Sequence, residues 1–160
     1  MIVVSDSSAL IALGSAGELS LLRDLFEEVL IPRRVWDEVV QANRPGAEQV
    51  TAAEWIRTIP APDTSFLLAL QGEVDPGEAE AIALAYEVKA DILLLDERRA
   101  RKLAISMGFP VVGVVGVLLR AKQQGFLPEL KPALDRMKTL QGFRISAKLY
   151  EDTLRDADET

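Results

Sequence analysis

The sequence predicts an α/β fold built on a mostly parallel sheet, and two observations favour this class. Short unbroken apolar runs, such as residues 2–4 and 92–95, are typical of strands buried on both faces. These runs alternate with segments whose apolar residues recur at helical spacing, as in successive βαβ units. The chain has 160 residues and no linker-like stretch, so residues 1–160 are expected to form a single domain.

In the first half of the chain, apolar periodicity and capping residues define the expected elements. The expected strands are residues 2–4, 29–31 and 55–59. The expected helices are residues 9–13, a helix from residue 18, one from residue 32 that ends before residue 43, residues 47–53, and a short one from residue 65. Gly14 and Gly17 are expected to end the first of these helices.

The second half of the chain shows the alternation more clearly. An Ala-rich helix is expected over residues 75–87, and a buried strand over residues 92–95. The remaining expected elements are a helix at 97–108, a strand at 111–115, a helix at 115–125, a helix at 127–140 and a terminal helix at 146–157.

Composition excludes several kinds of chemistry. The chain has no Cys and no His, which rules out disulfides, zinc–thiolate sites, thiol nucleophiles and Ser-His-Asp triads. Its formal net charge is −7, so any nucleic-acid site is expected to be a local basic patch on an acidic body. The longest apolar run, residues 111–119, is much shorter than the ~20 residues that span a bilayer. The N-terminal residues do not resemble a signal peptide, and we expect a soluble cytoplasmic protein.

Two acidic residues follow predicted strands directly. Asp6 comes after the first strand, and Asp96 comes after residues 92–95. Each could simply cap the helix that follows it, which would contribute about 1 kcal/mol. However, ligands of open parallel sheets bind at the carboxyl ends of the strands. The pair of Asp6 and Asp96 at equivalent strand ends therefore favours a shared site.

Two glutamates are further candidates, and each has a plain structural alternative. Glu78 fits a capping box with Asp75, but it also begins the helix face expected to contact the sheet. Glu80 lies about 200° away around that helix and is the weaker candidate. Glu38 could form an ordinary i,i+4 pair with Arg34. Its neighbour Asp37 cannot be distinguished from it by periodicity.

Several carboxylates at one edge of a sheet repel one another unless a cation lies between them. Without His or Cys ligands, that cation is expected to be Mg²⁺ or Mn²⁺ rather than Zn²⁺. Such ions orient water and stabilise the charge of an attacked phosphodiester.

Three segments together resemble a PIN domain, the fold of the VapC toxin ribonucleases. They are VSDSSALI, IPRRVWDEV and DPGEAEAIALAYEVKADILLLDERRARKLA, and the tail GFRIS at residues 142–146 also matches a VapC-related branch. The resemblance covers most of the chain. It implies a three-layer α/β/α sandwich and a metal-dependent ribonuclease, the toxin of a toxin–antitoxin pair.

The resemblance also assigns roles to individual residues. It implies that Asp6, Glu38, Glu78 and Asp96 form the catalytic metal site and that Ser8 supports the first Asp or contacts phosphate. In the commoner pattern a Thr, a variable residue and an Asp follow the strand, whereas this chain has Leu95-Asp96-Glu97. Glu97 is thus an alternative to Asp96 as the last metal ligand. The implied partners are RNA, a cognate antitoxin protein and a second copy in a homodimer, with no membrane.

A dense basic run follows Asp96 and is the candidate RNA-binding surface. It consists of Arg98, Arg99, Arg101 and Lys102, and its alternative is a solvated helix face.

Other functions stay open on sequence grounds. A PIN-like domain that keeps the carboxylates could bind a regulatory partner without cleaving RNA. A receiver-like phosphoacceptor is disfavoured because no lysine follows the strand at residues 111–115, and a dinucleotide site because no GxGxxG follows the first strand.

Overall fold

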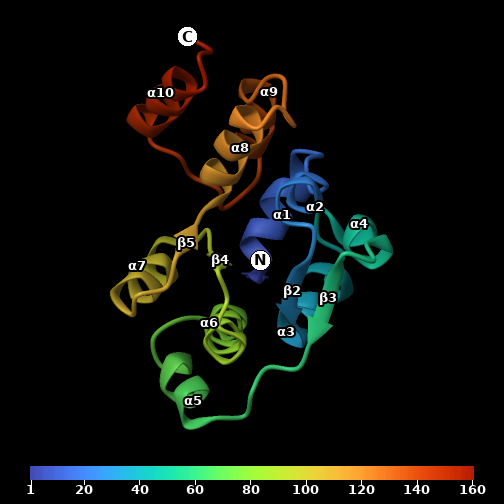
Figure 1. The fold of residues 1–160 in the computed structure, drawn as a ribbon, viewed down its shortest axis with the longest axis vertical. Coiled ribbons are helices and arrows are strands. Elements are labelled where there is room, and N and C mark those ends of the chain that lie inside the picture. The colour runs from blue at the N-terminus through green and yellow to red at the C-terminus, as the bar shows by residue number, and fades with distance from the viewer.

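A computed structural model describes residues 1–160 and contains one five-stranded sheet in which every pairing is parallel (Figure 1). The strand order is β3-β2-β1-β4-β5. The strands are β1 (Val3–Ser5), β2 (Val29–Pro32), β3 (Ile56–Ile59), β4 (Ile92–Leu94) and β5 (Val111–Val112). In the central register, Val4 pairs with Leu30 on one side and Leu93 on the other.

Helical segments connect the strands and surround the sheet. They are α1 (Ser7–Ser15), α2 (Leu21–Phe26), α3 (Arg33–Trp36), the π-helical segment η1 (Asp37–Gln41), α4 (Ala47–Ala52), α5 (Ser65–Gln71), α6 (Pro76–Val88), α7 (Arg98–Ser106), α8 (Val114–Gln123), α9 (Lys131–Lys138) and α10 (Ala147–Asp156). None of them is both long enough and apolar enough to cross a membrane.

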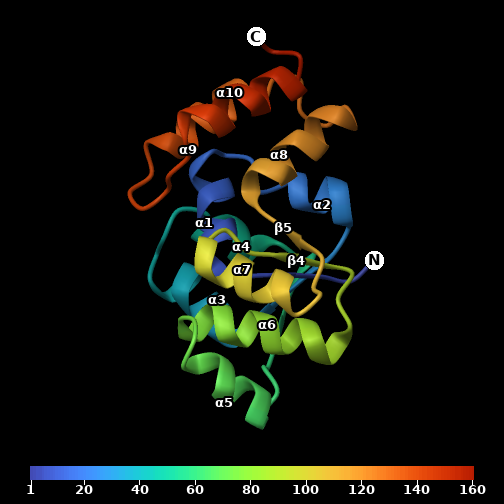
Figure 2. The ribbon, with the colours of Figure 1, turned by 90° about the vertical axis from the view of Figure 1, so that its left-hand side faces the viewer.

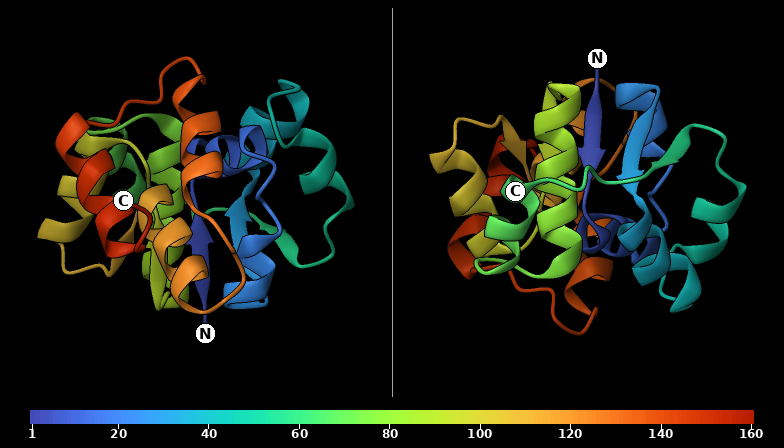
Figure 3. Two further views of the ribbon diagram at one scale, coloured as in Figure 1. Left: turned by 90° about the horizontal axis from the view of Figure 1, so that it is seen from above. Right: turned by 90° about the horizontal axis from the view of Figure 1, so that it is seen from below.

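Alternating strand residues belong to two separate hydrophobic cores. Val3 and Leu94 pack in a core with α1, α2, α8 and α9, whereas Val4 and Leu93 pack in a second core with α6 and α7. In Figure 2, α8, α9 and α10 lie on one side of β4 and β5, and α5 and α6 lie on the other. Figure 3 (right) shows α6 running alongside β1. The predicted three-layer α/β/α sandwich is therefore confirmed.

Several predicted boundaries are wrong. The helix expected from residue 18 begins only at Leu21. The strand expected at residues 111–115 ends at Val112, because Gly113 is the N-cap of α8. The helix expected at residues 127–140 begins only at Lys131, with Pro132 in its first turn. Gly14 lies inside α1 rather than ending it, and its missing side chain leaves room for the backbone of Gly46.

Candidate metal centre

Asp6 follows β1 directly and is almost fully buried, with 1% of its surface exposed. Its Oδ1 accepts a hydrogen bond from the Ala9 N–H (2.9 Å), which caps α1. Its Oδ2 accepts another from the Asp96 N–H (3.4 Å). Burial raises the pKa of Asp6 well above its usual range, and the nearby charges of Asp96 and Glu78 raise it further. Asp6 is thus a helix cap and also a buried acid surrounded by other acids.

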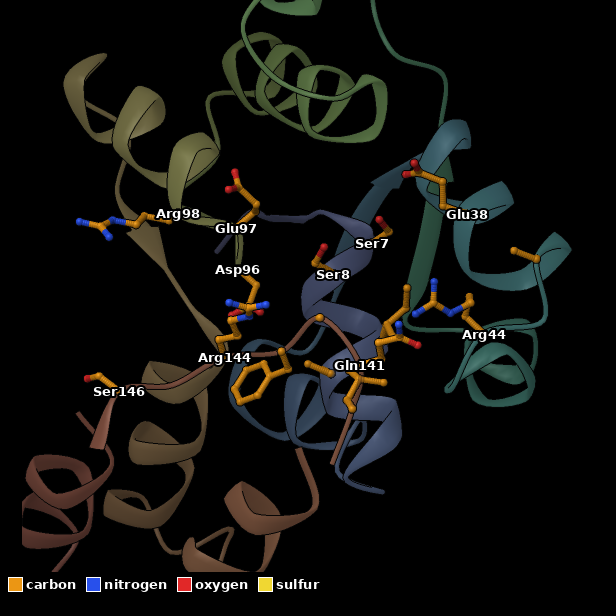
Figure 4. A pocket seen from close by; sticks show the side chains of 16 residues that line it. Ser7, Ser8, Glu38, Arg44, Asp96, Glu97, Arg98, Gln141, Arg144 and Ser146 are labelled. Carbon is orange, nitrogen blue, oxygen red and sulfur yellow. The ribbon is translucent and has the colours of Figure 1, made fainter. Parts of the chain in front are cut away.

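Asp96 lies two residues beyond β4 and beside Asp6, as the hydrogen bond between them requires. The alternative in which Asp96 caps the next helix is wrong, because the Glu97 carboxylate accepts the Ala100 N–H bond (3.0 Å) and caps α7. Burial raises the pKa of Asp96, although the Val114 N–H and the Arg101 charge oppose that rise. The Asp96 side chain therefore does not cap α7, and it lines an open cavity (Figure 4).

Arg101 is held at a fixed place near Asp96. Its Nη1 donates a hydrogen bond to the Leu95 carbonyl oxygen (3.2 Å). The guanidinium also occupies the space that a Cβ at Gly113 would fill, so glycine at that position makes room for it. Arg101 thus contributes a positive charge to the carboxyl edge of the sheet.

Glu78 begins α6 and has 5% of its surface exposed. The predicted capping box is confirmed: the Glu78 N–H donates to Asp75 Oδ1 (2.8 Å), and the Asp75 N–H donates to Glu78 Oε1 (3.1 Å). Burial, followed by the charge of Asp75, raises the pKa of Glu78 to about 7. Glu80 points elsewhere and pairs with Arg34 (3.3 Å).

Glu38 lies in the π-helical segment η1, a type of helix often found at functional sites. The alternative in which Glu38 forms an i,i+4 pair with Arg34 is wrong, because Arg34 pairs with Glu80 of α6. Glu38 Oε1 is buried and has no hydrogen-bond partner. It fits against Gly77, where a Cβ would overlap it. Burial raises the pKa of Glu38, as does the charge of Asp75, while the nearby Ser7 hydroxyl lowers it.

A cavity of about 770 Å³ opens at this edge of the sheet (Figure 4). Glu38 faces Ser7 and Ser8 across it, while Asp96 and Glu97 approach from the start of α7. The far wall comes from residues 140–144 and Ser146, which connect α9 to α10. The volume is typical of ligand pockets, which span ~300–1,000 Å³. Asp6 and Glu78 do not line this cavity.

The fold and the sequence motifs agree with a comparison against known families. The model of DUF3368, a PIN domain family, matches residues 2–159. The chain belongs to the PIN domain family. The resemblance noted in its sequence is therefore confirmed, and PIN domains are typically nucleases that use Mg²⁺. A search of the curated proteins gives no match.

The acids of this PIN domain fit a hard divalent cation in their chemistry but do not form a closed ligand cage. No group of three acidic side chains has the arrangement of a metal site. Asp6 and Glu78 instead accept capping hydrogen bonds. Yet all four candidate acids have raised pKa values, and Glu38 Oε1 is unpartnered. An all-oxygen donor set with uncompensated charge is what Mg²⁺ or Mn²⁺ requires. The roles of Asp6, Glu38, Glu78 and Asp96 as ligands stay predictions.

The basic run on α7 divides into separate environments. Arg98 lines the cavity and Arg101 is directed toward Leu95 and Gly113. Arg99 lies 4.0 Å from Glu73 in an exposed ion pair, and Lys102 is exposed outside the cavity. The proposed RNA contacts of these residues stay predictions.

Sequence reasoning missed several residues around the cavity. Ser7 rather than Ser8 affects the pKa of Glu38, and Gly77 supplies the space that Glu38 needs. Arg44 and Arg144 reach the cavity from distant parts of the chain. A loop arginine carries no local pattern that distinguishes it from a solvent-exposed one. The Gly77 position beside Glu78 was the one local sign available, since Gly in a first helical turn permits close approach.

Proposed function

We propose that this PIN domain is a metal-dependent ribonuclease that hydrolyses phosphodiester bonds. The observation that carries the proposal is the position of Asp6 at the carboxyl edge of the sheet, where its Oδ2 accepts a hydrogen bond from the Asp96 N–H and the charges of Asp96 and Glu78 both raise its pKa. Glu38 faces the first turn of α6 with an unpartnered oxygen. Raised pKa values on four acids in one region are typical of a functional site rather than of helix capping alone.

Each residue has a role in this proposal. Asp6, Glu78 and Asp96 would hold Mg²⁺ or Mn²⁺, with Glu38 as a further oxygen ligand. When bound, such an ion orients water and stabilises the negative charge of an attacked phosphodiester. Glu97 is less suited to this role than Asp96, because its carboxylate caps α7. The Ser8 hydroxyl, which lines the cavity, donates a hydrogen bond to substrate phosphate.

A cleavage assay tests the function. A fluorescent single-stranded RNA should be cut by the wild-type protein with Mn²⁺ and left intact with EDTA. Asp96→Asn should reduce the rate on the order of 10²-fold or more. Asp63→Asn, in an exposed loop, is the matched control and should keep the wild-type rate. Equal rates for the two variants, or cleavage in EDTA, would exclude this site as the nuclease centre.

A partner-binding role is the second candidate. The hydrogen bonds that Asp6 and Glu78 accept as helix caps favour it, because both carboxylates already have a structural role. This candidate predicts no RNA cleavage by the wild type and no stabilisation of the fold by Mn²⁺.

We further propose that the nuclease is the toxin of a toxin–antitoxin pair and acts in the cytoplasm as a homodimer. A free ribonuclease is harmful to its own cell, so a small inhibitor protein should cover the cleft. Light scattering on the purified protein tests the dimer, and a mass of one chain contradicts it. Loss of RNA cleavage when a co-purified small protein is present tests the inhibitor.

A further inference from the structure

The arginine side chains that have no partner all lie at the same cavity. The chain has twelve arginines, and seven of them form ion pairs with Asp or Glu. Arg101 donates to the Leu95 carbonyl, and Arg120 lies over the ring of Phe26. The remaining three have no side-chain partner: Arg44, Arg98 and Arg144. All three line the same cavity.

This coincidence is not expected of arginines that serve only solubility. In an acidic chain with 25 Asp and Glu residues, most exposed arginines find a carboxylate, as the seven paired ones do. Arg44 follows η1, Arg98 begins α7, and Arg144 lies between α9 and α10, so three distant segments each supply one free guanidinium. In Figure 4, Arg144 lies between Arg44 and Arg98, and the Arg98 side chain extends away from the other two at the edge of the cavity.

We infer that Arg44, Arg144 and Arg98 form a phosphate-binding track for single-stranded RNA across the cavity. The choice of ligand rests on the proposed function; the track itself rests on the three free guanidinium groups. The planar guanidinium of arginine binds phosphate oxygens in a bidentate manner. Its positive charge compensates here for the repulsion between RNA and the acidic residues that line the cavity, which are Glu38, Asp96 and Glu97.

The walls between the arginines favour a single strand over a duplex. Gln141 and Phe143 line the cavity beside Arg144. An amide can hydrogen-bond to the edge of an unpaired base, and an aromatic ring can stack on its face. A duplex keeps its bases stacked inside and offers neither group a contact. The three arginines therefore bind the RNA backbone, while Gln141 and Phe143 contact bases.

The sequence predicts that all four basic residues of α7 bind RNA, whereas the track includes only one of them. Arg98 belongs to the track, whereas Arg99 and Lys102 lie outside the cavity and provide a matched control pair. Arg44→Ala combined with Arg144→Ala removes two positive charges, and so does Arg99→Ala combined with Lys102→Ala. Because Arg44 and Arg144 have no side-chain partner, their removal should leave the urea midpoint unchanged.

The test measures the anisotropy of a fluorescent single-stranded RNA over a salt series in EDTA, which prevents metal-dependent cleavage. The Arg44/Arg144 variant should bind roughly tenfold more weakly per arginine removed. Its log–log salt slope should be smaller in magnitude by about 1.4, or ~0.7 for each lost phosphate contact. The control pair should keep both the affinity and the slope of the wild type.

Three results would overturn the inference. The first is an unchanged slope in the Arg44/Arg144 variant, and the second is an equal loss in the control pair, which indicates non-specific attraction. The third is retained RNA binding together with lost binding of a polyglutamate peptide, which assigns the arginines to an acidic protein partner.

Cleavage measurements with Mn²⁺ separate this inference from the proposed function. RNA binding that depends on Arg44 and Arg144 in a protein that never cleaves RNA would refute the nuclease and keep the track. Cleavage with a KM unaffected by the double substitution would refute the track and keep the nuclease.

Discussion

Replacing Glu78 with Gln should remove a defined part of the pH dependence of stability. Burial and the Asp75 charge raise the pKa of Glu78 from 4.5 to about 7. Between these two values the native state binds more protons than the unfolded state, so the free energy of unfolding falls as pH rises. The Glu78 contribution is complete below pH 4.5 and is lost as the pH passes 7.

The size of the effect follows from the shift. A change from 4.5 to about 7 corresponds to about 3 kcal/mol at about 1.4 kcal/mol per pKa unit. Glu78 keeps some solvent exposure, which screens part of this, so we expect Glu78 to account for about 1–2 kcal/mol of the loss between pH 5 and pH 8. Gln cannot ionise, yet it can still accept the Asp75 N–H bond of the capping box.

Urea unfolding in EDTA, followed by the fluorescence of Trp36 and Trp55, measures this difference at pH 5, 6, 7 and 8. The Glu78→Gln variant should lose about 1–2 kcal/mol less than the wild type over this range. Glu87→Gln removes one charge from the exposed side of the same helix and should follow the wild type. Identical pH dependence in Glu78→Gln and the wild type would show that the pKa of Glu78 is not raised by burial and the Asp75 charge.

Two further substitutions probe the other acids. Asp6→Asn keeps an oxygen that accepts the Ala9 N–H bond but removes a buried charge. Its free energy of unfolding without metal should therefore equal or exceed that of the wild type. A clear loss of this free energy in urea unfolding would mean that the charged cap dominates. Gly77→Ala adds a Cβ that overlaps Glu38 Oε1, so Mn²⁺ should raise the Tm less than in the wild type, and an equal rise would exclude Glu38 as a ligand.

The arrangement of the sheet and the positions of Asp6 and Asp96 could be predicted because both depend on local patterns. Short apolar runs give the strands, and an Asp directly after such a run lies at the carboxyl edge of a parallel sheet. The strand predicted at residues 111–115 was too long, because the apolar run Val-Val-Gly-Val-Val fits a buried strand and a buried helix equally well. Gly113 makes room for the Arg101 side chain, a contact that no local pattern reveals.

The surroundings of the acids could not be predicted, because they are set by contacts between distant segments. Arg34 pairs with Glu80, 46 residues later, in preference to Glu38 in the next turn. Glu38 is consequently left with an unpartnered oxygen beside Gly77. The same holds for Arg44 and Arg144, which line one cavity because α9 packs against α1 and α8 and α10 packs against α8.

Anomalous diffraction from crystals grown with Mn²⁺ tests the central claim most directly. The account predicts a peak at the carboxyl edge of the sheet, ligated by Asp6, Glu78 and Asp96, with Glu38 oxygens at or near the ion. In the same crystals the hydrogen bond from Asp96 N–H to Asp6 should lengthen as the Asp6 carboxylate turns toward the cation. A peak only at exposed acids elsewhere, or none at Mn²⁺ concentrations that saturate known magnesium sites, would contradict it.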